Sequence, residues 1–248
     1  MSNIKSAFQN GKAVIPFITC GYPDLETTGK IVRAAEKNGA DLIELGIPFS
    51  DPTAEGPVIQ EANIHALESG VTTDKIFDFI KELRKDVKIP LVFITYANVI
   101  FSYGPERFIS SCAETGIDGI IVPDLPYEEK EEFLPACQKY GVSLISVIAP
   151  ATEERIVMIA KEADTSFVRI ASDTDSSKPP KGIITGPDAV VSVIKSTVDI
   201  PCISEDISEA ADGRTFTEPI IELIAKHGKD AAEPIAEFIK EAKKSLNS

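Results

Sequence analysis

Short apolar runs alternate with amphipathic segments along the whole chain, and this alternation constrains the fold more than any other feature. Runs rich in Ile and Val are typical of parallel strands that are buried on both faces. Segments with apolar residues at helical spacing predict the helices between them. We expect strands at residues 13–19, 41–46, 91–95, 119–122, 143–148, 167–171 and 201–204, with a weaker one at 214–217. We expect helices at residues 25–38, 73–85, 128–140, 153–162 and 187–196, and a solvent-facing closing helix at 231–246.

This order of elements predicts an α/β fold with one domain over residues 1–248. Strands that alternate with helices through short connections indicate βαβ units and a parallel sheet. Up to eight strands in 248 residues without a linker favour a TIM (β/α)8 barrel over an open sheet. One connection is irregular, because a parallel crossover usually needs about a dozen residues or more and fewer separate Ile203 from Arg214. Either the crossover from strand 7 to strand 8 is a stub, or strand 8 is displaced or absent.

Composition excludes several classes of protein. The net charge of −14 argues against nucleic-acid binding, which needs clustered Lys and Arg. No apolar run approaches the roughly 20 residues that span a bilayer, and the N-terminus lacks the apolar core of a secretory signal. The cysteines form no C-x-x-C pair, so we expect reduced, buried thiols in a cytoplasmic protein and no zinc site. These are Cys20, Cys112, Cys137 and Cys202.

Chemistry in such a barrel lies at the C-terminal ends of the strands, and Glu44 is the most unusual residue there. It stands in an apolar strand between Ile43 and Leu45. A carboxylate in a dry interior is costly unless it is paired or functional, and burial would raise its pKa into the range of a general acid–base group. The alternative is a structural ion pair. Glu55, in the loop that follows, is a candidate partner acid or base if it lies near Glu44, and otherwise a solvated loop acid.

Three other residues stand at expected strand ends. Phe17 is either a core residue or a pocket wall, and Tyr96 is an aromatic residue that could line a pocket. Asp124 lies between two prolines, where it is either part of the site or a structural cap.

The run I-E-L-G-I-P-F-S-D-P-T-A-E-G-P-V-I-Q at 43–60, followed by T-Y-A-N and V-P-D-L-P-Y-E-E, closely resembles the alpha subunit family of tryptophan synthase. The resemblance covers roughly residues 1–165 and resumes after Gly186 and near residues 220–240. It implies cleavage of indole-3-glycerol phosphate to indole and glyceraldehyde 3-phosphate, a retro-aldol reaction that uses no cofactor. It also implies a partner, the tryptophan synthase beta subunit, which receives the indole and contacts the strand-2 loop.

The resemblance assigns roles to the residues that match its motifs. Glu44 takes the place of the general acid–base residue, and Glu55 that of an acid, usually Asp, that interacts with the indole nitrogen. Two carboxyl groups suit this reaction, because indole C3 must gain a proton while a glycerol hydroxyl loses one. The residues that would line the indole pocket are Phe17, Tyr96, Ile121 and Asp124.

The chain departs from the family where the family binds phosphate. Phosphate sites of this kind use glycine turns, so that backbone N–H groups can close on the anion. In this chain the three segments that follow strands 6, 7 and 8 lack these glycines. Arg169 also stands where the family has a tyrosine in strand 6. Acidic residues in their place cost about 1 kcal/mol in water and several in a partly buried pocket, so we expect weakened phosphate binding. The altered phosphate-site positions are Lys178, Glu205, Asp206, Thr217 and Glu218.

Three hypotheses follow. The first is an alpha-type lyase whose native activity is impaired by the loss of the phosphate site. The second is a redesigned or diverged barrel scaffold with a new C-terminal mouth and little or no native activity. The third is a cation or metal site, because D-T-D-S-S at 173–177 offers oxygen ligands at alternate positions. The simpler interpretation of that segment is a polar loop, and we predict no metal site.

Overall fold

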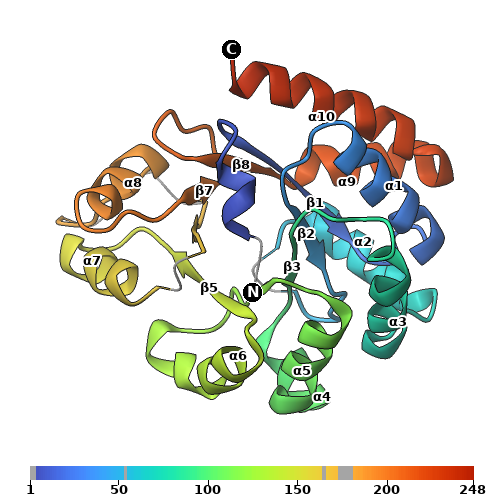
Figure 1. Cartoon of the computed structure of the whole chain (residues 1–248), viewed down its shortest axis with the longest axis horizontal. Coiled ribbons are helices and arrows are strands. Elements are labelled where there is room, and N and C mark those ends of the chain that lie inside the picture. Colours follow the sequence, from blue (N-terminus) through green and yellow to red (C-terminus); the bar gives the residue numbers. More distant parts are fainter. Residues whose placement is uncertain (1–3, 53–54, 164–165, 173–180) are drawn as a thin grey trace.

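The computed structural model of the chain describes residues 4–52, 55–163, 166–172 and 181–248. Eight parallel strands close into a barrel in sequence order, with helices around it (Figure 1). The predicted TIM barrel is therefore confirmed. The strands are β1 (Ala13–Thr19), β2 (Ile43–Gly46), β3 (Leu91–Ile94), β4 (Gly119–Ile121), β5 (Ser143–Ile148), β6 (Val168–Ile170), β7 (Cys202–Ser204) and β8 (Gly213–Phe216).

The helical layer follows the amphipathic pattern in most places. The α-helices are α1 (Leu25–Lys37), α2 (Pro57–Glu68), α3 (Thr73–Leu83), α4 (Ala97–Tyr103), α5 (Pro105–Thr115), α6 (Leu134–Tyr140), α7 (Glu153–Glu162), α8 (Pro187–Lys195), α9 (Glu218–His227) and α10 (Ala232–Leu246). Short 3-10 helices are η1 (Ile4–Phe8), η2 (Tyr127–Glu132) and η3 (Gly228–Asp230). At the start of α1, the Asp24 side chain accepts a hydrogen bond from Thr27 N at 2.7 Å, which satisfies one of the free N–H groups of the first turn.

The prediction of one helix over residues 128–140 was wrong. The segment divides into η2 and α6, with Phe133 between them. Pro135 stands in the first turn of α6, where its missing N–H does no harm, whereas inside a continuous helix it would remove a hydrogen bond. The apolar pattern did not predict α2, which Pro57 opens; there too the missing N–H of proline does no harm.

The crossover from β7 to β8 is a stub, as one of the two alternatives predicted. Residues 205–212 contain no helix, so a loop takes the place of a helix between α8 and α9 (Figure 1). Asp212 fastens this loop to the start of β7, because its carboxylate accepts a hydrogen bond from Cys202 N at 2.7 Å. The eighth strand is neither displaced nor absent: it pairs with β7 on one side and with β1 on the other.

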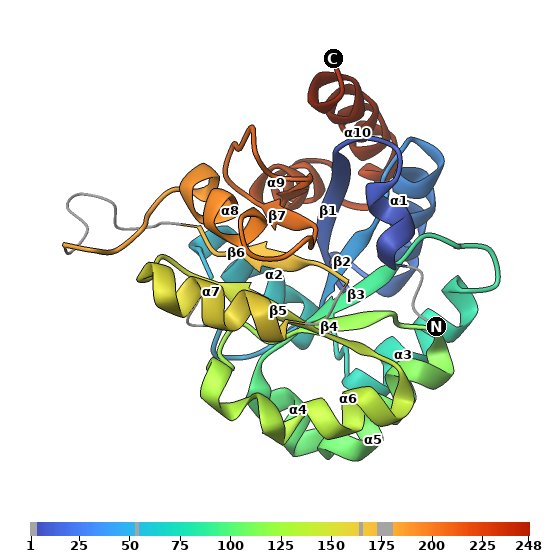
Figure 2. The same cartoon turned by 60° about the vertical axis from the view of Figure 1, so that its left-hand side comes forward.

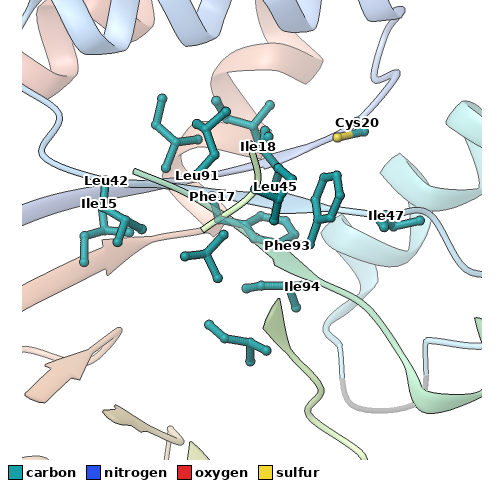
Figure 3. Close-up of a cluster of buried hydrophobic side chains, with 14 of the residues drawn as sticks. Ile15, Phe17, Ile18, Cys20, Leu42, Leu45, Ile47, Leu91, Phe93 and Ile94 are labelled. Carbon is teal, nitrogen blue, oxygen red and sulfur yellow. The ribbon is translucent and has the colours of Figure 1, made fainter. Parts of the chain in front are cut away.

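The buried apolar side chains form two clusters. The larger cluster joins β1–β5 and β8 to the helices around them and includes Ile203 of β7. Figure 3 shows its part between β1, β2 and β3. The smaller cluster joins β6 and β7 to α7 and α8, which lie together on one flank of the barrel (Figure 2). Within the described residues no helix is long and apolar enough to cross a membrane.

The structure also tests the predictions for the C-terminal helix and for the cysteines. The closing helix α10 packs against α1, burying Ile235 and Ile239, and Lys243 binds Asp41 at 2.6 Å. It is therefore solvent-facing on one side only. The cysteines are all buried and free, as predicted, and burial raises the pKa of Cys20 to about 12.

Candidate active site

Glu44 lies inside the barrel. It projects from β2 with no solvent exposure and forms an ion pair with Arg169 of β6, in which Arg169 Nη1 donates to Glu44 Oε2. Because β2 and β6 are not neighbouring strands, these two side chains can meet only across the barrel interior. The second nitrogen, Arg169 Nη2, lies 3.4 Å from Glu205 Oε2, directly after β7. Three strands thus bring one cation and two carboxylates together.

The surroundings of Glu44 shift its proton affinity in opposite directions. Burial raises the pKa of the Glu44 carboxyl, the Arg169 guanidinium opposes that shift, and the Glu205 charge adds to it. The second oxygen, Glu44 Oε1, is buried and makes no well-formed hydrogen bond among the described residues, although the nearby Thr215 hydroxyl acts on this carboxyl group and lowers its pKa. Oε1 is therefore the oxygen of this group that the Arg169 ion pair does not use.

Glu55 is the second predicted acid, and the structure brings it into the same cluster. It stands half-buried in the loop after β2. Burial raises the pKa of the Glu55 carboxyl; Arg169 opposes the shift, while the Glu205 and Glu44 charges add to it. These charges act on Glu55 because they are close to it in space. Both candidate acid–base residues therefore lie around Arg169.

Two of the predicted pocket residues lie on the inner face at the level of Glu44. Phe17 pairs with Glu44 in the β1–β2 register, so both side chains point inward. The Phe17 ring lies over Gly46, where a Cβ atom would come within 2.6 Å of it, so glycine is required there. The registers Gly46–Ile94 and Ile94–Ile121 place the buried Ile121 on the same face.

The other two predicted pocket residues lie at the edge of the site. Tyr96 is buried, with its ring centroid 5.0 Å from that of Phe49. Asp124 is exposed, and its carboxylate accepts a hydrogen bond from Ala97 N at 2.9 Å, in the first turn of α4. Asp124 thus makes the capping contact that was one of its two predicted interpretations. Its place in an indole pocket stays a prediction.

The altered phosphate-site positions that the structure describes follow the C-terminal ends of β7 and β8. Glu205 and Asp206 are half-buried after β7, and Thr217 precedes α9 with a buried hydroxyl that has no hydrogen-bond partner among the described residues. Glu218 opens α9, and its Oε1 atom lies 3.5 Å from the position of a Cβ at Gly56, next to Glu55 in the chain. Its negative charge therefore lies beside the loop that carries Glu55.

Some of the predictions fall outside the part of the chain that the structure describes. These are Lys178 and the possible oxygen ligands at 173–177. Among the described residues, no three His, Cys, Asp or Glu side chains are grouped so that they could hold a metal ion.

Sequence reasoning missed the partner of Glu44. Arg169 drew notice only as a replacement for tyrosine, although an arginine between Val168 and Ile170 in a buried strand is itself a signal. A buried guanidinium needs an anion, and a buried carboxylate needs a cation, so the two could have been matched.

A cavity of about 420 Å³ lies elsewhere, between β5, η2, α6 and α7. Leu144, Ser146 and Ile159 are among its lining residues, and neither Glu44 nor Glu55 is. The candidate site is thus defined by the convergence of charged side chains and not by this cavity.

A comparison with known protein families identifies the family of this chain. The family model described as tryptophan synthase alpha chain matches residues 2–204, from the N-terminus to the end of β7. The chain belongs to the tryptophan synthase alpha chain family. The match contains Glu44, Glu55 and Arg169, and it ends just before Glu205.

Individual relatives support the assignment over the full chain. The tryptophan synthase alpha chain of Lacticaseibacillus casei is 37% identical over 258 residues, which cover 100% of this chain and 97% of the relative. That of Clostridium acetobutylicum is 44% identical over 81% of this chain and 76% of its own. Among solved structures, tryptophan synthase subunit alpha from Legionella pneumophila has a TM-score of 0.86 at 28% identity, covering 99% of this chain and 98% of its own. A protein from Aquifex aeolicus has a TM-score of 0.87 at 32% identity over the whole of both chains.

Proposed function

We propose that this chain cleaves indole-3-glycerol phosphate into indole and glyceraldehyde 3-phosphate, in a retro-aldol reaction without a cofactor. The observation that carries the proposal is Glu44: a fully buried carboxyl group inside the barrel, with one oxygen outside the Arg169 ion pair, within the most specific motif of the family. The membership of the chain in the tryptophan synthase alpha chain family supplies the substrate.

The reaction needs two proton transfers, and two carboxyl groups are available for them. Indole C3 must gain a proton, and the hydroxyl group next to the breaking bond must lose one. We assign the acid–base work at these atoms to Glu44. Glu55 lies across the cluster, where its carboxylate would accept the indole N–H and stabilise the positive charge that develops on the ring.

We propose that the chain works with a tryptophan synthase beta subunit in the cytoplasm. A solved structure of a tryptophan synthase complex from Pyrococcus furiosus has a TM-score of 0.82 with this chain at 27% identity. In this chain a surface cleft of about 360 Å³ lies between the strand-2 loop and α4, lined in part by Phe49, Ser50 and Val99. This cleft is where we place the partner. Four buried, free cysteines suit a reducing compartment.

We further propose that the phosphate group of the substrate binds weakly. Half-buried Glu205 and Asp206 and the neighbouring Glu218 replace glycine-containing turns with negative charge. We therefore expect a high KM for indole-3-glycerol phosphate. Ordinary turnover with a low KM would contradict this.

The test is indole release from indole-3-glycerol phosphate, measured with and without a beta subunit. Glu44→Gln should lower kcat by about 10²–10⁴-fold, because it removes the acid–base group. Glu82→Gln is a matched control, since Glu82 is an exposed residue of α3 paired with Lys85. The melting temperature of each variant shows whether the fold survives, because the Gln variant leaves Arg169 without its buried anion. No indole from the unaltered chain, even with the partner present, would favour the scaffold hypothesis instead.

A further inference from the structure

The packing of the helical layer is interrupted beside β5. Helix α5 packs against α6, and α7 packs against α8, but α6 and α7 do not pack closely against each other, although both contact β5 (Figure 1). The cavity of about 420 Å³ lies at this interruption, between β5, η2, α6 and α7. Protein interiors contain few voids larger than a water molecule, so an opening of this size beside a strand is unusual.

The outward face of β5 explains the position of the cavity. Val147 is the partner of Arg169 in the β5–β6 register, and because Arg169 points into the barrel, Val147 does so too. Alternation along the strand therefore turns Leu144 and Ser146 outward, toward the helices, and both line the cavity. Parallel strands that are covered on both faces usually carry large apolar side chains, so the small, polar Ser146 leaves space unfilled.

The walls of the cavity come from both apolar clusters. Leu144 belongs to the larger cluster and Leu134 of α6 packs against it, whereas Ile159 of α7 belongs to the smaller one. Water is held poorly by apolar walls. A concave site of about 300–1,000 Å³ with mainly apolar walls and a few polar groups is typical of small-molecule binding. The cavity has the size and the lining of such a site.

The charged groups at the cavity join η2 to α7 by two ion pairs. Lys130 of η2 binds Glu162 of α7 at 2.5 Å, and Arg155 of α7 binds Glu128 of η2 at 2.7 Å. Within the described part of the chain, the charged residues that line the cavity are Lys130, Arg155 and Glu162. Two cations against one acid leave an excess of positive charge there, although the chain as a whole has a net charge of −14. This local excess favours an anionic ligand.

Both cations can exchange their present partners for a ligand. The side chains of Glu162 and Glu128 are each 57% exposed, so water weakens both ion pairs. Lys130 is more enclosed, at 21% exposed, and its Nζ atom lies 4.3 Å from the centroid of the Tyr127 ring. A ligand carboxylate at Lys130 would therefore replace a weakly held contact with a better shielded one.

We propose that this cavity, here called the β5 cavity, binds a small monocarboxylate with an apolar body. The body, aliphatic or aromatic, lies against Leu134, Leu144 and Ile159. The carboxylate meets Lys130 and Arg155 at the charged end. The β5 cavity is separate from the candidate active site, so the inference does not depend on the lyase function and adds a second ligand site to the chain.

The first experiment compares three probes that have the same apolar body and different head groups: octanoate, octan-1-ol and octylamine. Isothermal titration calorimetry should show one octanoate bound per chain. Octan-1-ol should bind about tenfold more weakly, because it lacks the charge-assisted hydrogen bonds of the carboxylate. Octylamine should bind more weakly still, since its ammonium group would face two cations. No binding of octanoate, or equal binding of octylamine, overturns the inference.

The second experiment locates the bound octanoate. Ser146→Phe places a large apolar side chain in the β5 cavity and should abolish octanoate binding. Ser192→Phe is the matched control, because Ser192 is an exposed serine of α8, and it should bind octanoate like the unaltered chain. The melting temperature of each variant shows whether it is folded. Unchanged octanoate binding in a folded Ser146→Phe variant overturns the inference.

The third experiment tests the carboxylate contact without changing the apolar walls, so it also decides the matter if Ser146→Phe does not fold. Lys130→Gln should weaken octanoate binding about tenfold and leave octan-1-ol binding unchanged. Lys139→Gln is the control, because Lys139 also pairs with a glutamate, Glu106, and lies over a tyrosine ring, Tyr140, but is not among the residues that line the cavity. Equal weakening in both variants would reflect the charge of the whole chain and would overturn the proposed contact.

Discussion

The two sides of this barrel differ in how they are built. On the side of β1–β4, every strand residue is buried, and the apolar side chains belong to the larger cluster. On the side of β6–β8, Arg169 and Arg214 interrupt the buried strands, and the last crossover lacks a helix. The apolar residues of β6 belong to the smaller cluster, whereas Phe216 of β8 belongs to the larger one. A barrel can therefore close although one side has charged residues in its strands and lacks a crossover helix, provided that every strand pairs with both of its neighbours.

The site takes one part from each side. Glu44 comes from the regular side, within the motif that identifies the family, while Arg169 and Glu205 come from the irregular side. The irregular side also carries the acids at the expected phosphate position. The residue to which we assign the acid–base chemistry and the charged residues that contact it thus lie in regions with different packing.

The largest expected effect comes from creating a cavity in each apolar cluster, which tests whether the two sides of the barrel contribute differently to stability. Phe93→Ala should lower the free energy of unfolding by about 3–5 kcal/mol, because Phe93 is fully buried against Phe77 and Phe108. Ile194→Ala, in α8, should cost closer to 2 kcal/mol, since its cluster is smaller. Urea denaturation measures both values. Equal losses would show that the two clusters contribute alike to stability.

A smaller effect compares two glycines at strand contacts. A Cβ at Gly213 of β8 would lie 2.9 Å from Ala13 Cβ and 3.0 Å from Ala13 O, so Gly213→Ala should cost about 1–3 kcal/mol. A Cβ at Gly119 of β4 would meet Ser143 O at 3.1 Å, and Gly119→Ala should therefore cost less. The measurement is again the urea midpoint. The reverse order would mean that the β8–β1 closure is the more adaptable of the two.

The smallest effect concerns the charge at the mouth. Asp206→Gly removes one negative charge from the expected phosphate position, so the KM for indole-3-glycerol phosphate should fall by about fivefold, which corresponds to roughly 1 kcal/mol. Asp199→Gly is the control, because Asp199 is exposed and precedes β7 at its other end. The prediction fails if both variants change the KM equally, or if neither does.

Local sequence patterns were enough for most of the fold. The apolar runs located all eight strands, and α7 lies at the predicted residues 153–162. Two of the failures involve proline, since Pro135 begins α6 after a break and Pro57 begins α2. The apolar pattern also did not predict α4, α5 and α9. Proline is favoured both in the first turn of a helix and in a loop, so its presence does not show which of the two a segment forms. Tertiary packing decided that the segments of Pro57 and Pro135 are helices.

The sequence by itself determined the barrel, the family motif and the identity of Glu44 as the residue to examine. These follow from local periodicity and from the improbability of a carboxylate in an apolar strand. Only the tertiary structure decided that Glu44 is paired with Arg169, which is 125 residues away in the chain. Alternation along a strand predicts which side chains point into the barrel, but a separation of 125 residues does not show which of them meet there. That is set by closure of all eight strands, including the β8 strand that follows the shortened crossover.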